Sequence, residues 1–359
     1  MVGGADLRYR WYPEGLVRRI TLGLNGRTFH DDLRGTDARY YTRFYRLTPW
    51  VRFDLRNAYT THFRQSLQLR YNIVGREVAV FDDNQAFAGK TFRRSNIWEA
   101  QYRLQQRALP NPYALAIQLE GQQYDVGAGR TAQYLRAGLE WKQQIFYKEK
   151  KKIEWRFYSG FFLKNTERFR KTLGFGPDDL IRGSLSLAQN GYADYKYDHA
   201  FPARNGGGGI LQRQVGLDEG GFKYAFGGPY AGSAGHSNDY ILSLNLKADL
   251  PARLPLGIPL KPYFDLGYAN MLHQPGGTER TLKSQVFWSG GFTLDFFKGN
   301  LNVWLPLVNS SNLRQLYCET SGGEGGNGIF CGGNYFKWIS WSVKLDGLEP
   351  FDLADRLIR

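Results

Sequence analysis

Residues 63–73 read FRQSLQLRYNI, and this stretch decides the fold because the polarity of its side chains alternates. Every second residue is apolar or nearly so: Phe63, Gln65, Leu67, Leu69, Tyr71 and Ile73. Successive side chains of a β-strand point to opposite faces, so one face suits hydrocarbon and the other suits water. A run of about ten residues is the length of a tilted strand that crosses a bilayer. The stretch therefore predicts a transmembrane β-strand.

The same alternation recurs along most of the chain. It predicts thirteen strands, near residues 4–11, 15–25, 39–55, 62–74, 95–107, 112–122, 131–145, 151–164, 238–250, 261–269, 284–297, 300–307 and 335–345. One such strand also fits a soluble sandwich, but many long ones favour an all-β, antiparallel outer-membrane β-barrel. The stretch 39–55 contains Pro49, so its division into two strands stays open.

Composition agrees with a barrel of this kind. Aromatic residues make up 16% of the 359 residues, and barrels carry aromatic girdles at both membrane interfaces. The formal net charge is +14, a value that also occurs in nucleic-acid-binding proteins. The basic residues are spread through the alternating strands and are not gathered in one patch, so a cation-rich lumen and contacts with anionic lipid are favoured instead.

The predicted connections alternate in length. Tight turns follow the strands that end near residues 11, 55, 107, 145 and 297, whereas the other connections, such as 75–94 and 308–334, are mostly long. Outer-membrane barrels have short periplasmic turns and long outer loops, so the tight turns face the periplasm. The first strand then runs inward, and we expect an odd number of strands upstream of residue 4. No signal peptide opens the chain, because charges interrupt the start MVGGADLRYR.

The alternation fails between residues 165 and 237. This segment is rich in glycine and tyrosine, including the run Gly206 to Gly209. A structureless connection of this length is improbable unless it has a function. We expect a long outer loop that folds partly into the lumen of a barrel spanning residues 1–345.

The two cysteines, Cys318 and Cys331, lie in one glycine-rich loop. A metal site would need further ligands, and that loop contains no histidine. The spacing therefore favours a disulfide formed in an oxidising compartment. No cofactor is expected. The tail 346–359 is predicted to be a short periplasmic helix, since Pro350 suits a first helical turn.

Several motifs carry a resemblance to a known family. They are LIRGS at 180–184, NLKADLP at 245–251, YFDLG at 263–267, WSGGF at 288–292 and the final strand YFKWISWSVKLDG from residue 335. Their order resembles the carboxyl half of the outer-membrane protein insertase and two-partner secretion superfamily, also called the bacterial surface antigen family. In that family an Arg-Gly-aromatic motif on a long loop meets an aromatic-x-Asp-x-Gly motif inside a sixteen-stranded barrel. The resemblance implies that three strands precede residue 4.

Carried over by motif, Arg182 and Gly183 match the loop, whereas Asp265 and Gly267 match the strand. Ser184 departs from the family pattern, because an aromatic residue is expected there. Alternation independently turns Asp265 into the lumen, where a carboxylate favours a cation and arginine is its best-defined partner. The alternative is that Asp265 pairs with another lumen base and that Arg182 is a solvated loop residue.

A second resemblance is to barrels attached downstream of gluzincin-type aminopeptidase domains in Gram-negative bacteria. It rests mainly on the last hundred residues, including PLVNSSN at 306–312 and LEPFDLADRL at 348–357. The H-E-x-x-H motif is absent from the sequence, so any peptidase would lie upstream. His236, Ser237 and Asn238 offer nucleophile and base chemistry, but three adjacent polar residues are ordinary loop composition. The chain itself is expected to be non-catalytic.

Three functions compete at this point. The first is a barrel for protein insertion or translocation in the bacterial outer membrane, with membrane lipid and periplasmic or outer-membrane assembly proteins as partners. The second is a membrane anchor for an upstream metallopeptidase. The third is a passive porin or channel, which only the polar lumen favours.

Overall fold

The computed structural model describes fourteen parts of the chain. They are residues 2–32, 41–56, 62–81, 87–108, 110–125, 131–149, 151–166, 168, 184–188, 210–224, 235–251, 258–273, 281–320 and 335–343. The predicted tail helix and the predicted upstream strands lie outside these residues.

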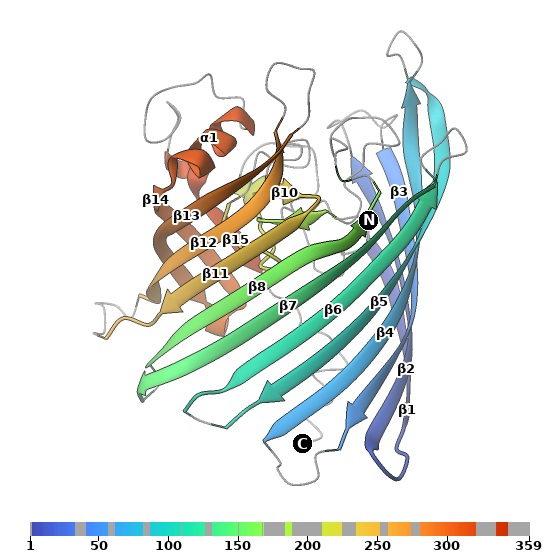
Figure 1. Ribbon diagram of the computed structural model, residues 1–359, viewed down its shortest axis with the longest axis horizontal. Helices are drawn as coiled ribbons and strands as arrows, with labels where there is room; N and C mark the ends of the chain where they lie inside the picture. Colours follow the sequence, from blue (N-terminus) through green and yellow to red (C-terminus); the bar gives the residue numbers. More distant parts are fainter. Residues whose placement is uncertain are drawn as a thin grey trace.

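Thirteen strands form one antiparallel sheet in the order β1 to β8 followed by β11 to β15 (Figure 1). Their bounds are β1 Val2–Trp11, β2 Val17–Asp32, β3 Tyr41–Leu55, β4 Phe63–Phe81, β5 Phe87–Gln106, β6 Tyr113–Asp125, β7 Thr131–Lys148, β8 Lys151–Asn165, β11 Tyr240–Ala248, β12 Leu260–His273, β13 Thr281–Phe296, β14 Leu301–Asn309 and β15 Ser340–Val343. The strands are tilted and run side by side around a curved wall (Figure 1). The predicted all-β antiparallel barrel fold is confirmed.

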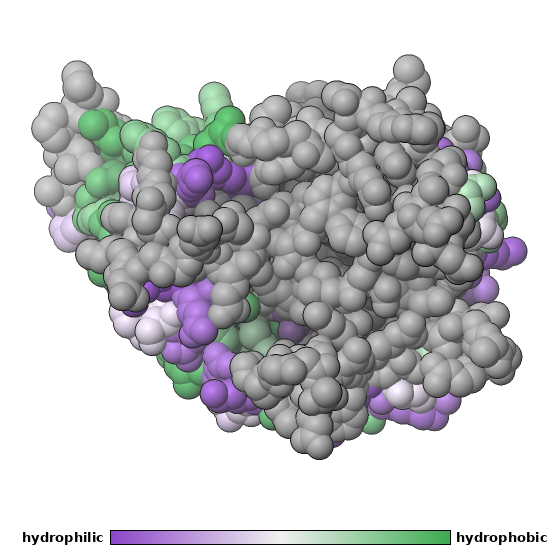
Figure 2. All heavy atoms as spheres, turned by 90° about the horizontal axis from the view of Figure 1, so that it is seen from above, coloured by the Kyte–Doolittle hydropathy of each residue, from purple (hydrophilic) through white to green (hydrophobic). Residues whose placement is uncertain are grey.

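Side chains of each strand divide between the two faces of this wall. In β4, Leu67, Leu69 and Tyr71 are exposed, whereas Ser66 and Asn72 are buried on the other face. Every strand of the large sheet except β15 places at least one exposed large hydrophobic residue on the surface. Viewed from above, hydrophobic residues follow the outline on the left side, where β11 to β14 lie (Figure 2). The sheet thus has an apolar outer face and a polar inner face.

The strand bounds differ from the predicted ones mainly at the ends. β4 extends to Phe81 and β5 begins at Phe87, so most of the expected loop 75–94 is part of a β-hairpin. Charged residues such as Arg76 and Arg94 interrupt the alternation there, but the backbone ladder continues across them. The last strand is shorter than predicted, because its first four residues form the 3-10 helix η6 Tyr335–Trp338 instead.

The stretch 39–55 forms one strand, β3, and Pro49 lies within it. Pro49 pairs with Leu24 of β2, while the ladder to β4 omits Thr48 and Pro49 and keeps the same register on either side. A proline has no N–H to donate, so a local gap in one ladder is the expected cost.

Besides η6, three short helical elements of the described residues lie outside the ladders. The connection 308–334, expected as a long outer loop, contains the helix α1 Ser311–Thr320. The 3-10 helix η5 Phe297–Gly299 forms the tight turn between β13 and β14, and η3 Ile210–Arg213 lies within the long segment between β8 and β11. No helix among the described residues is long and apolar enough to cross a membrane.

The main buried cluster lies on the inner face of β8 and β11 to β13. It includes Tyr158, Ile241, Met271 and Phe287. Within the described residues, no ladder joins β1 to β15, so the large sheet has two edges there. The cluster is where the long segment between β8 and β11 packs.

Candidate functional site

Two described pieces of the 165–237 segment lie against the inner face of the wall, and we call residues 184–188 and 210–224 together the inner segment. Its strand β9 Leu185–Ser186 pairs with β10 His236–Ser237. Four of its apolar side chains are almost completely buried in the inner-face cluster: Leu185, Leu187, Phe222 and Tyr224. Burial of this kind fixes the segment on the wall, since each large side chain contributes on the order of 1.5–3 kcal/mol.

A buried ion pair joins the inner segment to β12. Lys223 Nζ lies 2.8 Å from Asp265 Oδ1, and Asp265 has no exposed surface. Asn245 of β11 donates a second hydrogen bond to the same oxygen at 2.9 Å, and Lys223 also donates to the carbonyl of Gly221. Burial lowers the pKa of Lys223, while the Asp265 carboxylate acts in the opposite direction. The Asp265 carboxylate therefore binds the Lys223 ammonium group and accepts a hydrogen bond from Asn245 at the same oxygen.

Gly267 makes room for the inner segment two residues beyond Asp265, on the same face of β12. A Cβ atom at this position would lie 2.8 Å from a ring carbon of Phe222 and 2.9 Å from Cδ1 of Leu187. Real Cβ atoms do not approach neighbours this closely, so any larger residue would displace the segment. The Asp-x-Gly spacing of β12 thus supplies an anchoring charge and a steric gap on the same face.

A second buried ion pair fixes the inner segment at β7. Arg136 Nη1 lies 3.2 Å from Glu219 Oε1, and Arg136 Nη2 lies 2.6 Å from Glu120 of β6. Glu219 also accepts a hydrogen bond from the Ser186 amide at 2.6 Å, which joins the two pieces of the segment. The Tyr134 hydroxyl donates to Glu120 at 2.8 Å. Both carboxylates therefore have partners, as buried charges require.

The inner segment also contacts the last strand. The Val215 amide donates to the carbonyl of Trp341 at 2.8 Å, and Gln214 forms an isolated parallel bridge with Trp341. Ser340 donates its hydroxyl proton to the carbonyl of Lys223 at 2.6 Å. The segment therefore spans the wall from β7 to β15.

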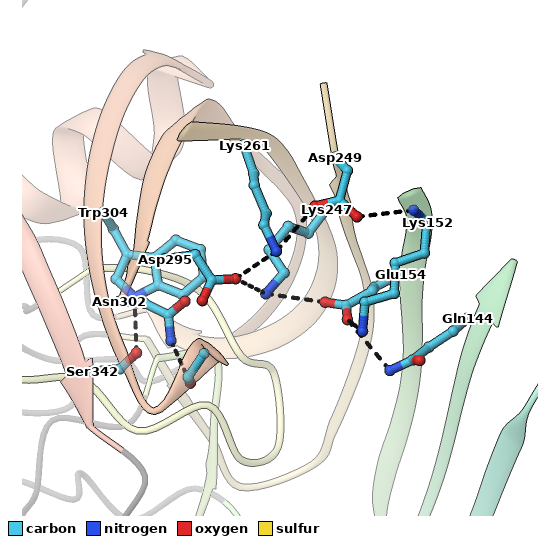
Figure 3. Close-up of polar contacts among 11 residues, drawn as sticks. Gln144, Lys152, Glu154, Lys247, Asp249, Lys261, Asp295, Asn302, Trp304 and Ser342 are labelled. Carbon is cyan, nitrogen blue, oxygen red and sulfur yellow. Dashed lines mark hydrogen bonds and ion pairs between the residues drawn. The ribbon is translucent and has the colours of Figure 1, made fainter. Parts of the chain in front are cut away.

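A charge network covers the inner face near the first residues of β8 and β12 and the last residues of β11 and β13 (Figure 3). Lys247 lies between Glu154 at 3.0 Å and Asp295 at 3.3 Å, and Lys261 lies between Asp295 at 2.8 Å and Asp249 at 3.1 Å. Cations and carboxylates alternate across neighbouring strands, which favours this register over a slipped one. The network stabilises the wall below the inner segment.

The predicted site residues fall into two groups. Asp265 and Gly267 lie on the inner face, in contact with the inner segment. Arg182 and Gly183 lie outside the described residues, as do Cys331 and the side chain of Cys318, so the predicted Arg182 contact and the disulfide remain predictions.

Sequence reasoning missed Lys223, Glu219 and Arg136. Arg136 lies directly opposite Glu120 in the ladder between β6 and β7, so pairing of the two predicted strands could have found this ion pair. No sequence signal distinguishes Lys223 from the other basic residues of the long segment. The structure also brings His236 Nδ1 to 3.1 Å from the Ser186 hydroxyl, a contact between residues far apart in sequence.

Comparison with known proteins gives a structural likeness only. No family model matches the chain, and no curated protein matches it by sequence. The crystal structure of BamA from Haemophilus ducreyi lacking POTRA domains 1-3 aligns with a TM-score of 0.42 and 11% identity, covering 86% of this chain and 59% of that chain. The outer membrane transporter YddB from Escherichia coli aligns with a TM-score of 0.22 and 9% identity, covering 84% of this chain and 58% of that chain. The chain thus spans under two thirds of the length of either structure.

Proposed function

We propose that this chain is the wall of a bacterial outer-membrane β-barrel of the insertion and translocation class, with its inner segment docked in the lumen. The observation that carries the proposal is the division of the sheet into an apolar outer face and a polar inner face, on which Asp265 and Arg136 pair with Lys223 and Glu219 of the inner segment. A closed antiparallel barrel is the β-structure that satisfies its backbone in lipid. The proposed partners are outer-membrane lipid and assembly proteins of the periplasm or outer membrane.

The direction of the strands supports a barrel with further strands. β1 and β15 are the first and thirteenth strands of an alternating antiparallel sheet, so they run in the same direction. Two parallel edges would close a barrel only through one parallel ladder, whereas an odd number of added strands gives every strand an antiparallel neighbour. This agrees with the three upstream strands that the family resemblance implies.

The docked segment favours an insertion or translocation barrel over a passive channel. Two buried ion pairs and a buried apolar cluster hold the segment against the wall, so it obstructs part of the lumen. A porin needs a water-filled path, and a segment held inside the lumen narrows that path. The metallopeptidase-anchor alternative has no comparable support in the described residues.

The proposal is tested with the full-length protein in lipid vesicles. We expect these vesicles to accelerate the folding of an unfolded eight-stranded outer-membrane barrel, measured by its heat-modifiable migration, and planar bilayers to show weak or intermittent conductance. Empty vesicles of the same lipids are the control. Large steady conductance without accelerated folding would reject the insertion class in favour of a channel. The absence of both activities would favour the anchor.

A further inference from the structure

We propose that a cavity on the inner wall binds a small organic ligand through a carboxylate or phosphate group, with Arg103 as the anchoring residue. The cavity has a volume of about 430 Å³ and is bounded by β4 to β8 and the inner segment. Sites for small ligands have volumes of roughly 300–1,000 Å³, so the space suits a metabolite-sized molecule. This inference goes beyond the proposed function, which assigns no ligand to the barrel.

The floor of the cavity is hollowed by small residues. Ala114 and Ala116 of β6 and Gly138 of β7 line it where their neighbours carry long side chains. Arg103 of β5 lies directly opposite Ala116 in the ladder, so no bulky partner covers its side chain. A long cation beside a hollow leaves its guanidinium free to meet a ligand.

The other three cations that line the cavity are each paired with an acid. Arg70 is paired with Glu99, while Lys142 and Arg156 are both paired with Glu140. The side chain of Arg103 makes no hydrogen bond or ion pair in the described part of the chain. An oxyanion would supply the missing counter-charge.

Longer-range charges do not replace that partner. Arg52 and Arg70 repel the charge of Arg103, and this repulsion is stronger than the attraction from Glu140 and Asp218. An anionic ligand beside Arg103 would reduce this repulsion.

Two glutamine side chains beside Arg103 can bind the remainder of such a ligand. Gln101 and Gln118 line the cavity and lie opposite one another in the β5–β6 ladder. Neither makes a side-chain hydrogen bond within the described residues. An amide offers both donors and an acceptor, and a guanidinium matches a carboxylate or phosphate through two parallel bonds. The site therefore fits an anionic group joined to a polar body.

The inner segment closes the cavity on one side. Asp218 and Glu219 line it, and Glu219 is the residue that pairs with Arg136. A second carboxylate on the ligand would meet these acids and be repelled by them. The geometry therefore favours a ligand that carries its negative charge at one end, next to Arg103.

The experiment titrates the purified chain in detergent with 3-hydroxybutyrate and with glycerol 3-phosphate by calorimetry, at constant ionic strength set with sodium chloride. We expect saturable binding of at least one probe, weakened about tenfold or more by Arg103→Gln, because a charge-assisted bond is lost. Arg103→Lys keeps the charge and should retain part of the binding. The two probes distinguish a carboxylate ligand from a phosphate ligand.

Lys142→Gln is the matched control, since Lys142 lines the same cavity but is already paired with Glu140. We expect it to leave binding within about twofold. Circular dichroism in the far ultraviolet checks that each variant keeps its strands. Absence of saturable binding to the wild-type protein, or equal weakening by Arg103→Gln and Lys142→Gln, would overturn the proposal, because either result leaves Arg103 as one hydrated charge among several.

Discussion

The ammonium group of Lys223 lies 2.8 Å from Oδ1 of Asp265, a carboxylate with no exposed surface. Asp265 belongs to β12, and Lys223 belongs to the inner segment. Because both groups are buried, each depends on the other for its charge. The ion pair therefore holds the inner segment in a defined position relative to β12.

Removal of one partner of this pair should destabilise the protein more than removal of both. We expect Lys223→Met or Asp265→Asn each to lower the free energy of unfolding by about 3–5 kcal/mol, because a buried group loses its partner. The double variant should cost much less than the sum of the two. Urea titration in detergent measures the stability of all four proteins, and strictly additive effects would show that the two groups are energetically independent.

Arg182 is the partner that the family resemblance assigns to Asp265. If Arg182 also reaches this carboxylate, Arg182→Ala should cost about 2–5 kcal/mol in docking of the long loop. Protease cleavage of the loop measures docking, and the same cycle is run with Asp265→Asn. If the effects of Arg182→Ala and Asp265→Asn are additive while those of Lys223→Met and Asp265→Asn are coupled, Lys223 alone is the partner of the Asp265 carboxylate.

Gly267 should not tolerate a side chain. Gly267→Val is expected to destabilise the inner segment by about 1–3 kcal/mol, because the new atoms would overlap Phe222 and Leu187. Faster protease cleavage within residues 210–224 is the measurement. Gly26→Val in β2 is the control, since a Cβ atom there has no neighbour within 4 Å. Equal cleavage of the Gly267→Val and wild-type proteins would contradict the steric role of this glycine.

Adjacent residues of β4 should respond oppositely to the same change. Leu69→Arg places a charge on the outer face and should cost about 2–4 kcal/mol if the residue lies near the bilayer midplane. Gln68→Arg places the same charge on the inner face and should be tolerated. The fraction of heat-modifiable protein recovered from the outer membrane measures both, and equal recovery would argue against an outer face in contact with lipid.

Cys318 and Cys331 should form a disulfide. Closure of about thirteen residues would stabilise the protein by roughly 3 kcal/mol in the chain-entropy model, less any strain in the loop. Mass spectrometry of peptides from unreduced protein identifies the bond, with the reduced sample as its control. Two free thiols in protein isolated from the outer membrane would refute the assignment.

The sequence by itself determined which stretches form the strands of the wall and which face each side chain occupies. Alternation in stretches such as residues 63–73 specifies a strand and assigns each side chain to a face, because a period of two is a local property of extended backbone. The thirteen predicted strands, and the inward direction of Asp265, follow from that period alone. Strand ends such as Phe81 were missed, because the alternation weakens there while the hydrogen-bonded ladder continues.

Only the tertiary structure decided which groups meet inside the wall. The long segment 165–237 has no period, and its basic residues are chemically equivalent candidates for Asp265. Lys223 meets Asp265 because Phe222 fills the gap at Gly267 and Glu219 binds Arg136. Strands that are far apart in sequence, β7 and β12, therefore fix the inner segment together. Contacts of this kind depend on the closure of a long loop, which sequence spacing does not specify.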